Sequence, residues 1–131
     1  MIMKKLLEVS AIIEIVTGIT LLVVPALLAS ILLGNALDTA GGLAVARVAG
    51  VAIVSLGLAC WFGSRDAHSL ACLGIVAAML VYNLGVVVLF VSLRYGAGMT
   101  GIGLLPVSAL HAVLAAWCIT CLRMAWLPKR T

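Results

Sequence analysis

The chain alternates between long apolar runs and short polar gaps. Four runs are long enough to cross a membrane as helices, and we place these helices at about residues 6–24, 43–62, 69–93 and 102–127. A helix needs about 20 consecutive apolar residues to span a bilayer. The tight polar gap at residues 63–68 makes the second and third helices antiparallel neighbours. The pattern predicts an all-α polytopic membrane protein, a four-transmembrane-helix antiparallel bundle formed by a single domain over residues 1–131.

A proline interrupts the chain at the end of the first run. Pro25 cannot donate a hydrogen bond to the carbonyl of Leu21, so the helix kinks or ends there. Residues 26–33 are too few to span the membrane again, and we expect a bent continuation or a short interfacial helix. Residues 34–42 then form a turn-rich loop.

The N-terminal sequence also has features of a secretory signal. Lys4 and Lys5 precede the apolar run, and residues 26–30 resemble a cleavage site. Glu8 and Glu14, however, interrupt the run. We therefore expect an uncleaved membrane helix.

The amino-acid composition indicates that most of the chain is surrounded by lipid rather than by water. Hydrophobic residues make up 66% of the chain and charged residues 9%, and the mean hydropathy is +1.36. A soluble domain of this size cannot bury so much apolar surface. The formal net charge of +4 is not accompanied by a basic patch interleaved with aromatic residues, so we expect no nucleic-acid partner.

The basic residues predict the orientation in the membrane. Four spans place both termini on one side, and that side carries Lys4, Lys5, Arg65, Arg123, Lys129 and Arg130. The opposite loops carry Arg94, with Arg47 just inside the membrane. The positive-inside rule then predicts a multi-pass protein of a bacterial-type inner (plasma) membrane with both termini cytoplasmic.

Small residues recur at helical spacing on three of the runs. Lipid provides no hydrophobic drive between helices, so close backbone approach matters more than in water. These stripes predict either a tight bundle or docking faces for another protein. Their members are Gly42, Ala46 and Gly50; Gly74 and Ala78; and Ser108, Ala112 and Ala116.

Polar residues lie within the apolar runs at related depths. A rise of about 1.5 Å per residue places Arg47, Tyr82, Asn83 and His111 at one level, towards the outer leaflet. Glu14 lies lower, on the first helix, and shares a polar stripe with Ser10, Thr17 and Gly18.

In a functional interpretation, the four outer residues line a pocket for an anionic or carbonyl-bearing amphiphile, such as a quinone head group. Glu14 would carry a proton, because a low dielectric disfavours its charged form.

A structural interpretation explains most of the same residues. Arg47 would bond to the carbonyl of Leu21 or to Asp38, or extend towards the interface. Asn83 and His111 would form interhelical hydrogen bonds worth about 0.6 kcal/mol on average. A direct pair between Glu14 and Arg47 needs tilted helices, so we expect separate partners. Glu14 is the residue that this interpretation explains least well.

The four cysteines fall in the predicted cytoplasmic half. Cys118 and Cys121 form a C-x-x-C pair, which suggests redox or metal chemistry. The pair lies inside a predicted helix on the reducing side, and cysteine also packs as a small apolar residue. We favour packing and predict no metal site. His68 and His111 lie in opposite leaflets, too far apart to ligate one haem.

The run Ala46-Arg47-Val48-Ala49-Gly50, together with Gly57 and the preceding Pro25 and Leu33-Gly34, resembles the small bacterial membrane proteins of the DoxX-like group. This resemblance implies a four-helix bundle of the inner membrane, and some members are linked to quinone or sulfur redox enzymes. It brings no catalytic motif to this chain.

The leading functional prediction is non-catalytic. The chain would be an accessory or scaffold subunit that packs in the lipid bilayer against a larger membrane complex or against copies of itself, without a cofactor. The first alternative is a binder or carrier of a quinone- or lipid-like amphiphile. The second is a membrane thiol-redox protein that uses Cys118 and Cys121.

Overall fold

A computed structural model describes residues 1–35, 37–66 and 69–126. These residues form five helices and no strand: α1 (Ile2–Val23), α2 (Pro25–Leu33), α3 (Ala40–Gly63), α4 (Leu70–Tyr95) and α5 (Leu104–Trp126). All except α2 are long and apolar enough to cross a membrane. The predicted all-α fold with four membrane-spanning helices is confirmed, and the chain is a multi-pass membrane protein.

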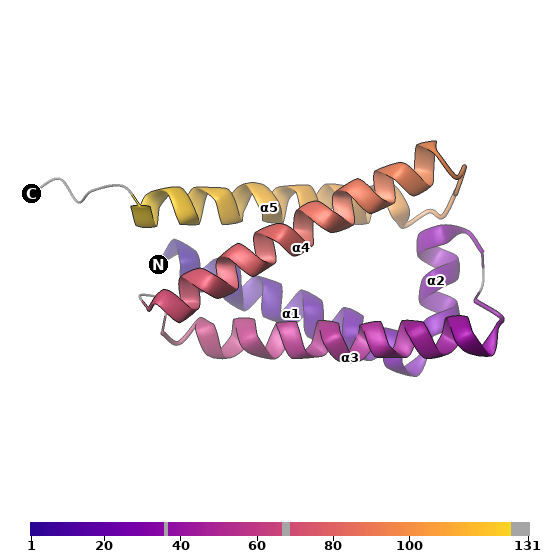
Figure 1. The fold of residues 1–131 in the computed structure, drawn as a ribbon, viewed down its shortest axis with the longest axis horizontal. Helices are drawn as coiled ribbons and strands as arrows, with labels where there is room; N and C mark the ends of the chain where they lie inside the picture. The colour runs from indigo at the N-terminus through magenta and orange to yellow at the C-terminus, as the bar shows by residue number, and fades with distance from the viewer. Residues whose placement is uncertain (36, 67–68, 127–131) are drawn as a thin grey trace, which may run out of the picture.

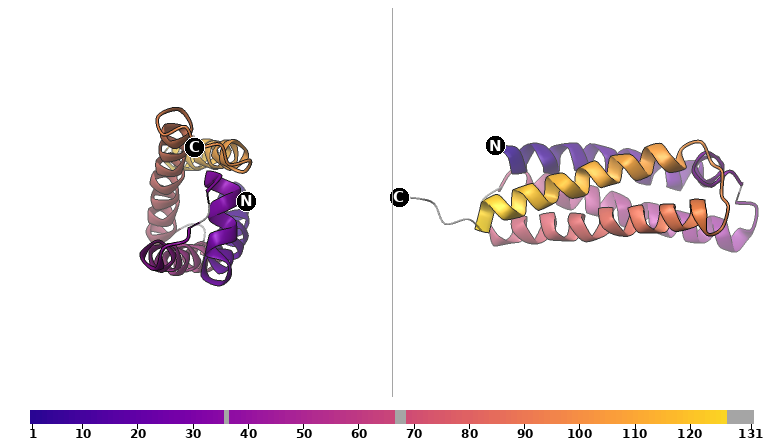
Figure 2. Two further views of the ribbon diagram at one scale, coloured as in Figure 1. Left: turned by 90° about the vertical axis from the view of Figure 1, so that its right-hand side faces the viewer. Right: turned by 90° about the horizontal axis from the view of Figure 1, so that it is seen from above.

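The four long helices lie side by side, and α2 lies across one end of the bundle (Figure 1). Helices α1 and α3 form one closely packed pair, and α4 and α5 form a second (Figure 2). The two pairs contact each other more sparsely. The N-terminus, the turn between α3 and α4 and the end of α5 share the end opposite α2 (Figure 1). That this end is cytoplasmic stays a prediction, and His68, Lys129 and Arg130 lie outside the described residues.

Pro25 begins a separate helix instead of bending α1. It occupies the first position of α2, where its missing N–H group leaves no bond unmade. Helix α2 ends at Gly34, whose φ of 83° is in the left-handed region that favours glycine. Of the two alternatives predicted for residues 26–33, a bent continuation or a short helix, the structure has the short helix.

Glycines bring α1 and α3 into backbone contact. A Cβ atom at Gly18 would lie 2.7 Å from the carbonyl oxygen of Gly50, and one at Gly50 would lie 2.8 Å from that of Gly18. A Cβ at Gly57 would lie 3.0 Å from the amide nitrogen of Ile15. Because any side chain here would push the helices apart, these glycines set the distance between them, as expected for helices that pack in lipid.

The predicted small-residue stripe on α3 belongs to this seam only in part. Ala46 and Gly50 are buried, but Gly42 lies in the first turn of α3. There its amide donates to Oγ1 of Thr39, the residue that caps the helix.

The predicted stripe on α5 does not pack within the chain as a unit. Ser108 is buried, whereas Ala112 and Ala116 are exposed. The buried side of α5 carries His111, Leu114 and Cys118 instead. Because an α-helix has 3.6 residues per turn, residues spaced four apart are rotated progressively around the helix axis. Ala112 and Ala116 are therefore turned away from the interface in which Ser108 is buried. On α4, Gly74 and Ala78 are exposed as well.

Two sets of contacts join the pairs at opposite ends. At the end of the bundle that carries α2, the amide of Gly103 donates to the carbonyl of Ile31 in α2 at 2.9 Å, and the backbone at Gly101 packs closely against Leu32. The loop before α5 thereby satisfies a carbonyl in the last turn of α2. At the other end, side chains from all four long helices form the core: Leu6, Leu7, Ala11, Cys60, Cys72, Val76, Met79, Leu114, Cys118 and Cys121.

Candidate functional site

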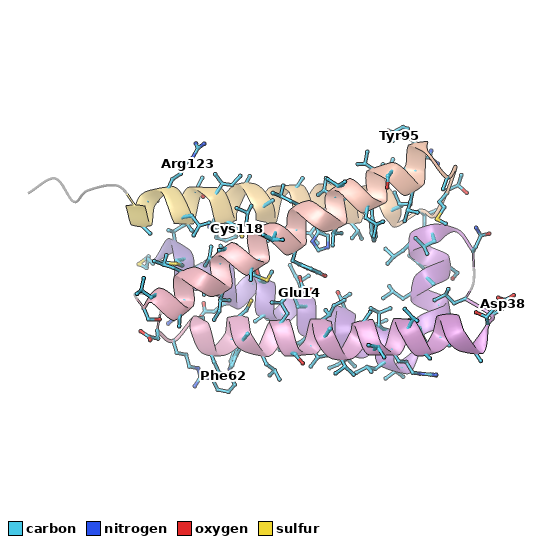
Figure 3. The ribbon with its side chains drawn as sticks, viewed as in Figure 1. Glu14, Asp38, Phe62, Tyr95, Cys118 and Arg123 are labelled. Carbon is cyan, nitrogen blue, oxygen red and sulfur yellow. The ribbon has the colours of Figure 1, made fainter. Side chains whose placement is uncertain are left out.

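Glu14 occupies the interior of the bundle, near the middle of α1. It is 1% exposed, and Figure 3 shows it between the helices, whereas Phe62 and Arg123 project outward. Its Oε2 atom accepts a hydrogen bond of 3.0 Å from the hydroxyl of Tyr82 on α4. Its Oε1 atom is buried and has no hydrogen-bond partner in the described part of the chain. A buried carboxyl group with only one oxygen satisfied is costly in an apolar environment.

Ser10 lies one turn before Glu14, and its Oγ atom also lacks a partner among the described residues. The side chain is 0% exposed. Other helical serines in this chain donate to the carbonyl one turn earlier, as Ser55 does to Val51 and Ser108 to Leu104. Ser10 makes no such bond. Residues four apart share a helix face, so α1 presents two adjacent polar groups with unused hydrogen-bonding capacity.

Asn83 and His111 form a second part of the cluster and are joined by a hydrogen bond. Nδ2 of Asn83 donates to the carbonyl of Met79 at 2.7 Å, and its Oδ1 lies 2.7 Å from Nδ1 of His111. Because an amide oxygen can only accept, Nδ1 of His111 carries the hydrogen and donates it. Asn83 is 0% exposed and His111 is 6% exposed. This bond ties α4 to α5 inside the second pair.

Tyr82 connects the two parts. Its ring meets the ring of His111 edge to face, with centroids 5.6 Å apart and an interplanar angle of 79°. The His111 ring thereby holds the phenol on one side while its hydroxyl donates to Glu14. Four of the five predicted ligand-binding residues, Glu14, Tyr82, Asn83 and His111, therefore come together from α1, α4 and α5.

Arg47, the fifth, does not join them. It is exposed on α3, and its Nε atom donates to the carbonyl of Leu22 at 3.3 Å. Leu22 lies in the last turn of α1, whose carbonyls lack amide partners further along that helix, and a cation is favourable there. The structural interpretation expected the carbonyl of Leu21 or Asp38 as the partner, or extension of the side chain towards the interface. The acceptor is the next carbonyl along, and Arg47 fastens α3 to the end of α1.

Ser10 was not singled out from the sequence as a site residue. It appeared as one member of a polar stripe, together with Thr17, which is half-buried, and Gly18, which packs on α3. Its position four residues before Glu14 could have identified it as a site residue, because that spacing places both side chains on one face of the helix.

The four cysteines lie together in the core rather than at a surface. Cys60, Cys72, Cys118 and Cys121 are free thiols, each 0–2% exposed. In the described ranges, no group of three or more His, Cys, Asp or Glu side chains could hold a metal ion. Redox chemistry at Cys118 and Cys121 would require a redox partner to reach their thiols. The side chains packed around both thiols block this access.

Comparisons with protein-family models, with curated proteins and with solved structures return no match for this chain. The resemblance to DoxX-like proteins stays an expectation.

Proposed function

We propose that this chain binds the polar head of a membrane-soluble amphiphile, of quinone or lipid type, at Glu14 and Ser10. The observation that carries the proposal is the unpartnered Oε1 atom of Glu14, buried beside the unpartnered hydroxyl of Ser10. Folded proteins satisfy nearly all of their buried polar groups. Two adjacent exceptions on one helix face indicate a position where a ligand supplies the missing partner.

The chemistry of the two groups favours a head group that carries a carbonyl or hydroxyl. Oε2 of Glu14 already accepts from Tyr82, so a neutral Glu14 donates its own proton through Oε1. The hydroxyl of Ser10 can donate to the same acceptor. A hydroxyl-bearing head group would instead donate to the Oε1 oxygen. Such bonds are stronger in the low dielectric of the bundle than in water.

Access to the cluster follows from the way in which the helices pair. Glu14 belongs to the α1–α3 pair, and Tyr82 belongs to the α4–α5 pair. Glycines hold α1 and α3 together, whereas the pairs meet more sparsely. An amphiphile that arrives from the membrane reaches Glu14 by separating the pairs, without opening the seam inside either one.

The test is purification in a mild detergent, followed by native mass spectrometry and extraction of lipids and quinones. We expect a stoichiometric amphiphile on the wild-type chain and a loss of affinity of about threefold to tenfold in Ser10→Ala, the value of one hydrogen bond. Ser55→Ala is the matched control, because Ser55 is exposed and bonds to its own helix. Glu8→Gln is the corresponding control for Glu14→Gln.

Two results would contradict this proposal. One is a wild-type chain that carries no amphiphile. The other is an amphiphile retained equally by Ser10→Ala and Glu14→Gln, because neither polar group would then contact it.

A second candidate function, an accessory subunit of a membrane complex or homo-oligomer, is favoured by the outward face of α4. Cβ atoms built at Gly74 and Gly85 would meet nothing within 4 Å, and Ala78 is exposed between them. Small residues on a lipid-facing surface allow another helix to approach closely. Ala78→Leu should reduce co-purification with a partner, while Ala77→Leu, equally exposed but turned about 100° around the helix, should not.

A further inference from the structure

The outer surface of the α1–α3 pair carries an apolar groove, separate from the polar cluster. The groove has a volume of about 300 Å³ and is lined by Ile12, Ile15 and Val16 of α1 and by Leu58 and Trp61 of α3. Ile12, Val16, Leu58 and Trp61 are each 39–60% exposed. The close approach of the two backbones at Gly57 brings these side chains together as two walls. A volume of this size lies at the lower end of the range for ligand pockets, about 300–1,000 Å³.

One end of the groove is positively charged. The guanidinium carbon of Arg65 lies 5.4 Å from the centroid of the Trp61 ring, within the range of a cation–π interaction. This contact holds the charge of Arg65 over the rim of the groove. Lys5 precedes Ile12 by seven residues and Glu8 precedes it by four, so both lie on the same face of α1 as the groove. Glu8 is paired with Lys4 at 3.8 Å, so Lys5 adds a second positive charge at this end.

No carboxylate among the described residues forms an ion pair with Arg65. Among the described residues the one ion pair is that between Lys4 and Glu8, at 3.8 Å. Asp66 follows Arg65 in the chain and is exposed, but it is not within ion-pair distance of it. A polar group at the mouth of the groove would therefore meet a guanidinium that already rests on an aromatic ring.

We propose that this groove binds an acyl chain of an anionic phospholipid, whose phosphate contacts Arg65 and Trp61. The aliphatic walls suit a hydrocarbon chain, and they lie on helices that cross the membrane. Tryptophan is favoured at membrane interfaces, and its indole N–H can donate to a phosphate oxygen. Arginine binds phosphate through several N–H groups. A net negative head group is preferred over a zwitterionic one because the mouth of the groove is positive.

The experiment uses the full chain with Trp61 as its only tryptophan, made by Trp117→Phe and Trp126→Phe. It is reconstituted in phosphatidylcholine vesicles that contain increasing fractions of acyl-brominated phosphatidylglycerol or acyl-brominated phosphatidylcholine. We expect Trp61 to be half-quenched at an about fivefold lower fraction of the anionic lipid, the preference that one basic residue supplies near a membrane surface. Native mass spectrometry of the wild-type chain from an equimolar lipid mixture should show retained phosphatidylglycerol.

Arg65→Gln should abolish the preference for the anionic lipid. Arg123→Gln is the matched control, since it removes the same charge from an exposed position of α5 at the same end of the bundle. Equal quenching of Trp61 by the two lipids in the single-tryptophan chain with Arg65 intact would overturn the proposal. An equal loss of the preference for the anionic lipid in Arg65→Gln and Arg123→Gln would also overturn it. Absence of quenching by either lipid, with the chain migrating as an oligomer, would overturn it in favour of a second copy that covers the groove.

Discussion

Buried polar residues in this bundle differ in how many of their polar atoms are hydrogen-bonded, and bonded and unbonded groups lie side by side. Asn83 uses both its amide nitrogen and its amide oxygen, so it has a structural explanation. Glu14 uses one oxygen of two, and Ser10 uses none of its capacity. The burial of all three is nearly complete. Burial alone therefore does not separate structural from functional polar groups, whereas their hydrogen bonds do.

Asn83→Ala should destabilise the bundle, because it leaves the Nδ1–H group of His111 buried without an acceptor. The expected loss is about 1–3 kcal/mol in the free energy of unfolding, measured by thermal or denaturant unfolding in detergent. Replacing both partners, in Asn83→Ala with His111→Leu, should cost less than the sum of the single changes. Strict additivity of the two changes would show that the hydrogen bond contributes nothing.

Glu14→Gln should leave stability nearly unchanged if Glu14 is neutral in the folded chain. The amide oxygen of glutamine can accept the hydrogen bond from Tyr82 in place of Oε2. Tyr82→Phe, in contrast, removes that donor and leaves the carboxyl with no partner, at a cost of about 1–3 kcal/mol. Unfolding in the same detergent compares the two variants. A large loss in Glu14→Gln would instead show that the fold requires an ionised carboxylate at this position.

At the scale of helices, the seam between α1 and α3 is set by glycines whose role depends on what they face. Gly50 faces a carbonyl oxygen of α1, whereas Gly74 on α4 faces open space. Both lie in helix interiors. The same substitution should therefore have opposite effects at the two positions.

Gly50→Ala should destabilise the chain by about 1–3 kcal/mol, because its Cβ would force the two backbones apart. Gly74→Ala should be neutral or stabilise by up to about 1 kcal/mol, since alanine has the higher helix propensity and nothing obstructs it. Thermal unfolding of the two variants in one detergent gives the comparison. If Gly50→Ala were as stable as Gly74→Ala, the close approach at this seam would not be required for folding.

The helices were more predictable than the faces they present to one another. Apolar runs determine length and number directly, so four spans could be predicted from the sequence. Residue counts also give depth, which is why Tyr82, Asn83 and His111 were placed at one level. They do not give rotation about the helix axis. For that reason Arg47 was grouped with residues that it does not contact, and the stripe through Ala112 could be assigned neither to the bundle interior nor to a docking face. Gly18 packs against Gly50, although the sequence pattern assigned it to a polar stripe with Ser10 and Thr17.

At the scale of the whole molecule, the two helix pairs are joined by a backbone contact at one end and by the cysteine-containing core at the other. The amide of Gly103 donates to the carbonyl of Ile31 in α2, while Cys118 and Cys121 pack among side chains of the other long helices. The polar cluster lies between these two connections. The pairs can then separate locally at Glu14 while both ends hold, which is what the proposed binding of an amphiphile requires.

The core at the cysteine end should protect all four thiols from a membrane-permeant maleimide. Each thiol is 0–2% exposed, so labelling requires local opening of the bundle and should be at least about tenfold slower than at an exposed site. The control is Asp66→Cys, which introduces an exposed thiol in the α3–α4 turn at the same end of the molecule. Labelling is followed by intact-mass spectrometry in detergent. Cys118 and Cys121 reacting as fast as the introduced thiol would show that this end of the bundle is open, and would revive a thiol-redox function for the pair.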